Sequence, residues 1–199
     1  MFSGLRAFFG RVRGYIQITQ MSPIARRYFI KNGFDGSMTM LGIVIGSRVV
    51  EVTRPEVIVT AGLGACLAMG VSGLFGAYMT EKAERKRHLK SLESAMLVDL
   101  KNSIHSDASD FVSFYAAIID GASPALTAMI AIIPFMLALS GALAIWDAYI
   151  VSFAATLATL FCLGLYLGRI AKENILLYGV QTVAAGIFIV LISFILGTI

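Results

Sequence analysis

The sequence predicts an all-α integral membrane protein with five transmembrane helices. Of its 199 residues, 58% are hydrophobic and only 14% are charged, whereas about a quarter of the residues in a soluble domain are charged. Residues 120–199 contain only five charged side chains. Uncharged apolar runs of roughly 20 residues match the thickness of a bilayer. These runs do not alternate with a period of two, so helices are expected rather than barrel strands.

The apolar runs define five expected spans, with the first opening at an aspartate. The spans cover residues 34–50, 56–79, 123–145, 148–168 and 175–199. Only Trp146 and Asp147 separate the third span from the fourth, which predicts a tight antiparallel hairpin. The first span is short and begins within "NGFDGSMTMLGIVIG", at Asp35.

The distribution of Lys and Arg predicts how the chain is oriented. These residues concentrate before the first span, between the second and third, and between the fourth and fifth. The connection between the first two spans contains only Arg54, with Arg48 inside the end of the first span, and the third connection contains neither residue type. Under the positive-inside rule the N-terminus is cytoplasmic and the C-terminus outside. In a prokaryote this would be the cell membrane. The net charge of +4 reflects this topology, and no nucleic-acid partner is expected.

The chain divides into four expected segments. Residues 1–31 form a cytoplasmic amphipathic segment, residues 32–80 the first two spans, residues 81–118 a cytoplasmic helical region, and residues 119–199 the last three spans. The cytoplasmic region lacks Gly and Pro, so the second helix is expected to continue beyond the membrane and form a short helical hairpin.

Polar groups within the spans are the candidates for function. An intramembrane carboxylate is costly and is by default a functional hypothesis, although Asp35 has two alternative roles, capping the first span or pairing with Lys31. Small residues allow helices to approach closely in lipid, which fits plain packing, a homodimer or a narrow pathway. The pore-lining candidates are Asp35, Met38, Thr39, Ser72, Gly73, Gly76 and Thr80.

The charged region offers a second, weaker set of candidates. Its acidic members are Glu81, Glu84 and Glu93. Their three- and four-residue spacing among Lys and Arg is more typical of a solvated helix with internal ion pairs. His88 and His105 are too isolated for a metal-ligand pattern. The sequence has no phosphate-binding loop or nucleophile elbow, so neither an enzyme nor a tightly bound cofactor is expected.

Three segments together resemble the vacuolar iron transporter family of five-helix metal transporters. They are "NGFDGSMTMLGIVIG", "MGVSGLFGAYMTEKAE" and "NILLYGVQTVAAGIFIVLISFILG". The resemblance covers roughly residues 30–199 and implies a homodimer in which the first two helices line a central pore. It assigns the first-helix metal ligand to Asp35. At other ligand positions of that family this chain has Ala65, Gly73 and Ala77.

These observations lead to one expected function and two alternatives. The expected function is proton-coupled transport of a divalent cation of the iron or manganese type, with the cation as the only ligand. Oxygen ligands at Asp35 would favour hard ions. One alternative is a member of the same fold that moves a different solute. The other is a membrane partner that transports nothing.

Overall fold

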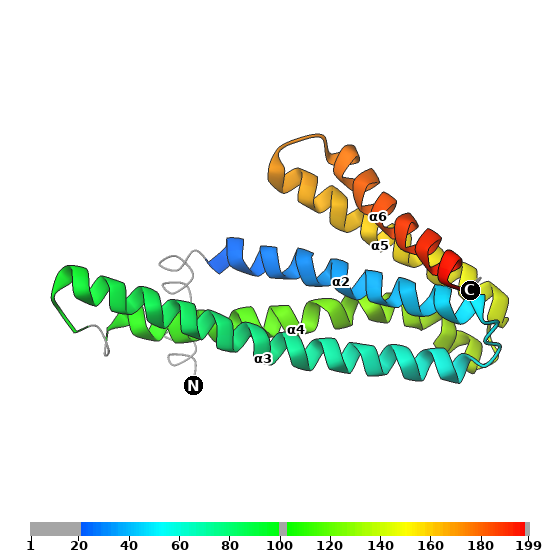
Figure 1. Cartoon of the computed structure of the whole chain (residues 1–199), viewed down its shortest axis with the longest axis horizontal. Helices are drawn as coiled ribbons and strands as arrows, with labels where there is room; N and C mark the ends of the chain where they lie inside the picture. Colours follow the sequence, from blue (N-terminus) through cyan, green and yellow to red (C-terminus); the bar gives the residue numbers. More distant parts are fainter. Residues whose placement is uncertain (1–20, 100–102, 198–199) are drawn as a thin grey trace, which may run out of the picture. The chain divides into compact units, whose positions relative to one another are not determined.

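The computed structural model describes residues 21–99 and 103–197, and these are helical apart from short connections (Figure 1). The expected all-α class is therefore confirmed for this part of the chain. An amphipathic segment was expected in residues 1–31. Its first 20 residues lie outside the described residues, and the remainder belongs to the helix that begins at Met21. The elements are α2 (Met21–Val49), α3 (Pro55–Met96), α4 (Ile104–Leu139), α5 (Ile145–Ala171) and α6 (Ile175–Gly197).

Four stretches within these helices are long and apolar enough to cross a membrane. They are Pro55–Met96, Ser106–Leu139, Ile145–Ala171 and Ile175–Ile195. The chain is therefore a multi-pass membrane protein. The first expected span lies in α2, which is not among the four and has Lys31, Asp35 and Arg48 along its length.

Helices α2, α3, α4 and α5 are all longer than their expected spans. Helix α2 begins at Met21, well before residue 34, and α4 begins at Ile104, well before residue 123. Helix α3 continues to Met96, as the absence of Gly and Pro predicted. Charged and polar side chains do not end a helix, because its backbone hydrogen bonds continue in water as they do in lipid.

The connection between α4 and α5 differs from the expected one. Helix α4 ends at Leu139, and a turn containing Gly141, whose φ is +78°, leads to α5. Trp146 and Asp147 were expected to form this turn, but they lie in the first turn of α5. Glycine adopts positive φ without steric cost, which explains why the chain reverses direction at residue 141.

The described residues form two compact units. Unit 1 contains residues up to Phe29 together with Val71–Ala122, and unit 2 contains Ile30–Gly70 together with Ser123–Ile199. In unit 1, α3 and α4 bury a seam of small side chains. The seam consists of Ala77, Ala108, Val112, Ser113, Ala116 and Ala117.

Unit 2 has a larger apolar core and internal hydrogen bonds that join hydroxyl groups to backbone carbonyls. Its main buried cluster is formed by Met40, Val44, Ile58, Val59, Cys66, Ala128, Ala131, Ile132, Phe135, Ala148 and Tyr149. Thr127 Oγ1 donates to the Gly33 carbonyl at 2.8 Å, and Ser152 Oγ donates to the Ala131 carbonyl at 2.7 Å. These bonds satisfy polar groups without any charge in the core.

Helices α5 and α6 pack closely side by side in unit 2 (Figure 1). A Cβ atom at Gly164 would overlap Thr182 Oγ1 and lie 2.6 Å from the Tyr178 carbonyl oxygen. Thr182 Oγ1 itself donates to the Leu160 carbonyl at 2.8 Å. The absence of a side chain at Gly164 therefore permits both the close approach and the bond between the helices.

Candidate functional site

Helix α2 has two different faces, and Asp35 lies on the uncovered one. The side chains of Asp35 and Thr39 are exposed, and no atom lies within 4 Å of where a Cβ would stand at Gly42 or Gly46. Residues at positions i, i+4, i+7 and i+11 share one face of a helix. We call these four residues the α2 stripe: Asp35, Thr39, Gly42 and Gly46.

The opposite face of α2 packs against α4 through glycines. A Cβ atom at Gly36 would overlap the Pro124 carbonyl oxygen and lie 2.6 Å from Pro124 Cα. A Cβ atom at Gly33 would lie 3.3 Å from Thr127 Cγ2. The small residues beside Asp35 in the sequence therefore allow the opposite face to pack closely, and they leave the carboxylate itself uncovered.

Neither structural alternative for Asp35 agrees with this geometry. The capping alternative is wrong because α2 begins at Met21, so Asp35 lies in the helix interior. The pairing alternative is not seen either. Ion pairs join Glu81 to Arg27 and Arg85 and join Arg54 to Glu56, whereas none joins Asp35 to Lys31, both of which lie in the described part of the chain.

The other candidates of the first span separate in the same way. Thr39 shares the exposed stripe with Asp35. Met38 is half-buried and packs against the cluster of Leu41, Ile45 and Leu160. The structure therefore brings Thr39 together with Asp35 and turns Met38 toward the core.

The candidates on α3 belong to unit 1 and also separate by face. Ser72, Gly76 and Thr80 are exposed, and Gly76 has open space around it. Gly73 packs inward, because a Cβ there would lie 2.9 Å from the Asp120 carbonyl oxygen and 3.0 Å from its Oδ2. A bulky residue at Gly73 would thus disturb packing within one copy, so this position is unsuitable for testing a dimer.

The exposed candidates on α3 form part of a longer row. At four-residue spacing along this helix, six small or hydroxyl-bearing residues are all exposed. They are Thr60, Gly64, Ala68, Ser72, Gly76 and Thr80. Residues four apart form a ridge on a helix surface, so this row is a second uncovered surface on which another backbone could pack closely.

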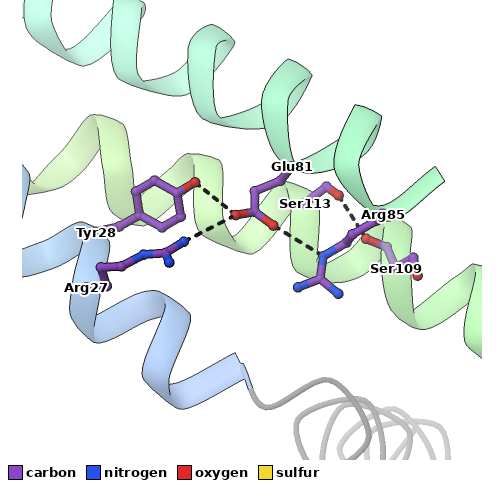
Figure 2. Close-up of polar contacts among 6 residues, drawn as sticks. All are labelled: Arg27, Tyr28, Glu81, Arg85, Ser109 and Ser113. Carbon is purple, nitrogen blue, oxygen red and sulfur yellow. Dashed lines mark hydrogen bonds and ion pairs between the residues drawn. The ribbon is translucent and has the colours of Figure 1, made fainter. Parts of the chain in front are cut away.

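The acidic candidate Glu81 is the centre of a polar cluster in unit 1 (Figure 2). Tyr28 donates its hydroxyl hydrogen to Glu81 Oε1 at 2.9 Å, and Arg85 Nε lies 3.4 Å from Glu81 Oε2. Arg27 Nη2 lies 4.0 Å from Oε1. The Glu81 side chain is only 12% exposed, so both of its oxygens face protein groups. We call this set the Glu81 cluster: Arg27, Tyr28, Glu81 and Arg85.

The electrostatics of this cluster favour a neutral Tyr28 hydroxyl. Burial raises the pKa of the Tyr28 hydroxyl, and the hydrogen bond to Glu81 and its negative charge raise that pKa further. Arg85 and Arg27 supply the compensating positive charge. Glu81 thus joins α2 to α3 and has no oxygen directed at an open site. Glu84 is exposed, and Glu93 is half-buried with a partner.

The sequence interpretation missed two features of unit 1. One is Asp120, a half-buried carboxylate of α4 that lies against Gly73. The sequence signals it, because Asp120 directly follows the mostly apolar stretch "FVSFYAAII". The other is the pair Arg27 and Tyr28, which lie in the cytoplasmic amphipathic segment expected in residues 1–31. No short motif signals their contact with Glu81, because more than 50 residues lie between them.

The geometry restricts how a single copy could hold a metal ion. Within residues 21–99 and 103–197, no group of three or more His, Cys, Asp or Glu side chains is arranged to hold one. His88 is exposed, and the side chain of His105 is not described. Asp35 could therefore offer a cation a single carboxylate per copy, with the Thr39 hydroxyl on the same face.

Comparison with known proteins identifies an archaeal relative. No family model matches the chain. The chain is 33% identical over 171 residues to the uncharacterized protein MJ0645 of Methanocaldococcus jannaschii, and the match covers 84% of this chain and 86% of that protein. The similarity therefore extends over nearly the whole of both sequences.

Proposed function

The chain belongs to the same family as MJ0645, and because that protein's name states no activity, we propose a function from the geometry of α2 itself. The proposal is a homodimeric membrane transporter for a small hard cation, in which the α2 stripes of two copies line the pathway. Its five spans would comprise the four long apolar helices and the part of α2 that carries the stripe.

The observation that carries this proposal is the exposed position of Asp35. An ionised side chain that faces lipid costs several kcal/mol, so intramembrane carboxylates face a protein interior or water. Asp35 lies in the interior of α2 and is not covered by the described part of its own chain. A second copy of the chain, or a water-filled path between two copies, would provide the polar surroundings that one copy lacks.

The remainder of the stripe supports a dimer. Gly42 and Gly46 have open space around them, and so do Gly64 and Gly76 of the α3 row. Glycines on an exposed face let two backbones approach closely in lipid. Two α2 stripes related by a two-fold axis would present one cation with two Asp35 carboxylates and two Thr39 hydroxyls.

The chemistry of these ligands indicates a class of cation. Carboxylate and hydroxyl oxygens suit hard ions such as Mn²⁺, and soft thioether or thiolate ligands are absent from the stripe. We include coupling to protons in the proposal because the resemblance to vacuolar iron transporters implies it. The resemblance to vacuolar iron transporters agrees with this class, although Ala65, Gly73 and Ala77 offer no ligand side chains.

Transport by Asp35→Asn in liposomes tests this function. Asparagine keeps the size of the side chain and removes the charge, so we expect Mn²⁺-dependent proton flux to fall to the level of empty liposomes. Asp147→Asn is the matched control, because Asp147 is an exposed carboxylate in the first turn of α5. It should transport like the unmodified protein.

Two results would contradict the proposal. Full flux in Asp35→Asn would show that the carboxylate is not the ion site. No flux in the unmodified protein with Mn²⁺, Fe²⁺ or Ca²⁺ would favour either a different solute or a membrane partner that transports nothing.

A further inference from the structure

An open cavity lies at the end of unit 2 where α2 ends and α5 begins. Its volume is about 650 Å³, within the range of roughly 300–1,000 Å³ that is usual for small-molecule sites. Helices α2, α5 and α6 all contribute to its walls. Most of its lining is aliphatic or aromatic: Val44, Ile45, Val49, Phe153, Val190 and Phe194.

The lining also includes two opposite charges close together in the sequence. Arg48 lies in the last turn of α2, and its guanidinium carbon is 4.4 Å from the centre of the Trp146 ring. Glu51 follows the helix with a left-handed backbone, φ 55°. Both line the cavity, and the described chain has no ion pair between them. Each charge is therefore available to a ligand.

The aromatic residues at this end hold the site in shape. Trp146 stacks on Tyr149 with ring centres 5.8 Å apart, and Tyr149 donates its hydroxyl hydrogen to the Val52 carbonyl at 2.8 Å. This bond ties α5 to the connection that follows Glu51. Trp and Tyr are enriched where membrane helices meet the head-group layer. The charges of the cavity therefore match the position of a lipid head group, and its apolar walls match the position of an acyl chain.

We propose that this cavity binds one bilayer phospholipid whose head group carries a phosphate and a primary ammonium group. An acyl chain occupies the apolar walls, the phosphate accepts hydrogen bonds from Arg48, and the ammonium group lies beside Glu51. The carbonyl end of α2, where the helix dipole is negative, also favours the ammonium group. This assignment is independent of the transport proposal, because no residue of the α2 stripe lines the cavity.

The chain provides its own probe for this ligand, because Trp146 is its single tryptophan. Bromine atoms on an acyl chain quench tryptophan fluorescence on contact. Purified protein in detergent is titrated with brominated phosphatidylethanolamine, brominated phosphatidylglycerol and brominated diacylglycerol. We expect saturable quenching, with half-saturation at the lowest mole fraction for phosphatidylethanolamine and the highest for diacylglycerol.

Charge variants assign the two head-group contacts. Loss of a charge-assisted hydrogen bond in Arg48→Gln should raise the half-saturation point for phosphatidylethanolamine roughly tenfold, and Arg48→Lys should recover most of it. Glu51→Gln should remove the preference for phosphatidylethanolamine over phosphatidylglycerol. The matched controls are Arg54→Gln and Glu56→Gln, because both residues are exposed in the same region and neither lines the cavity. They should behave like the unmodified protein.

A further variant tests occupancy of the cavity itself. Val190→Phe enlarges an α6 side chain that lines the walls, and it should weaken quenching by all three lipids without lowering the melting temperature. Equal quenching by the three lipids would overturn the proposal by showing only general contact with surrounding lipid. An unchanged half-saturation point in Arg48→Gln would also overturn the proposal. So would a complete absence of quenching, which would indicate that a second copy covers the cavity.

Discussion

Unit 1 and unit 2 hold their helices together with different chemistry. Unit 1 joins α2 to α3 through ionised side chains in the Glu81 cluster. Unit 2 joins helices through hydroxyl groups that donate to backbone carbonyls, as Thr127 does to Gly33, and through glycines such as Gly36. Charges are tolerated where water is near, whereas lipid requires contacts that carry no charge.

Asp35 is an exception within this comparison. Most charged residues of unit 2 lie at helix ends or in connections. These are Arg48, Glu51, Arg54, Glu56, Asp147, Arg169, Lys172 and Glu173. Lys31 and Asp35 both lie exposed in the interior of α2, but only Asp35 lies within the expected first span, residues 34–50. A residue that departs from the chemistry of its own unit is a strong candidate for function.

The largest effect is expected from Gly36→Ala in unit 2. The new methyl group would overlap the Pro124 backbone, and overpacking against backbone should destabilise the protein by about 3 kcal/mol. The control is Gly42→Ala, with both variants measured in a detergent that keeps the chain monomeric, because Gly42 has open space around it within one copy. It should keep or slightly raise the melting temperature in detergent, because alanine favours helix over glycine by about 1 kcal/mol. Equal melting temperatures for the two variants would contradict the close contact.

The sequence predicted the helical class and the apolar runs well, because hydrophobicity and length determine what can cross a bilayer. It did not predict where α2 and α4 begin, since polar residues at a membrane surface do not end a helix. The position of the α4–α5 turn could have been found, because Ser140-Gly141 is a turn-forming pair inside the expected third span.

The candidate site was predictable only in part. Asp35 stands out in the sequence because a carboxylate at the start of an apolar run is rare. The sequence does not show that Gly73 packs inward against Asp120 while Gly76 stays uncovered. That difference depends on the side from which α4 approaches α3, and residue spacing along α3 does not contain this information.

The next largest effect is expected from Glu81→Gln in unit 1. The substitution leaves Arg85, whose side chain is 17% exposed, without its anion, and should cost about 1–3 kcal/mol. Backbone hydrogen exchange should become faster in residues 23–29 and 71–96, which the cluster joins, and stay unchanged in residues 148–168. Tyr28→Phe is the milder companion, because it removes one donor and keeps every charge. An equal increase in amide exchange rates in both units would contradict the conclusion that the Glu81 cluster stabilises unit 1 alone.

The smallest effect is expected from Thr127→Val in unit 2. It removes the hydrogen bond to the Gly33 carbonyl, and such bonds between membrane helices contribute about 0.6 kcal/mol on average. The control is Thr159→Val, because the Thr159 hydroxyl bonds only to Ala155 of its own helix. The melting temperature should fall slightly for Thr127→Val and stay unchanged for Thr159→Val. A larger fall for the control would show that these hydroxyl bonds do not join the helices.

The most direct test of the central claim, that the α2 stripe faces a second copy, is cysteine cross-linking at Thr39 in native membranes. The native Cys66 and Cys162 are first replaced by alanine, and Thr39→Cys is then oxidised. We predict a disulfide-linked species of twice the 21.4 kDa chain mass, and none for Val180→Cys, which is also exposed but lies on α6. Cross-linking at Val180 but not at Thr39 would contradict the account, because the carboxylate of Asp35 would then have no second copy beside it.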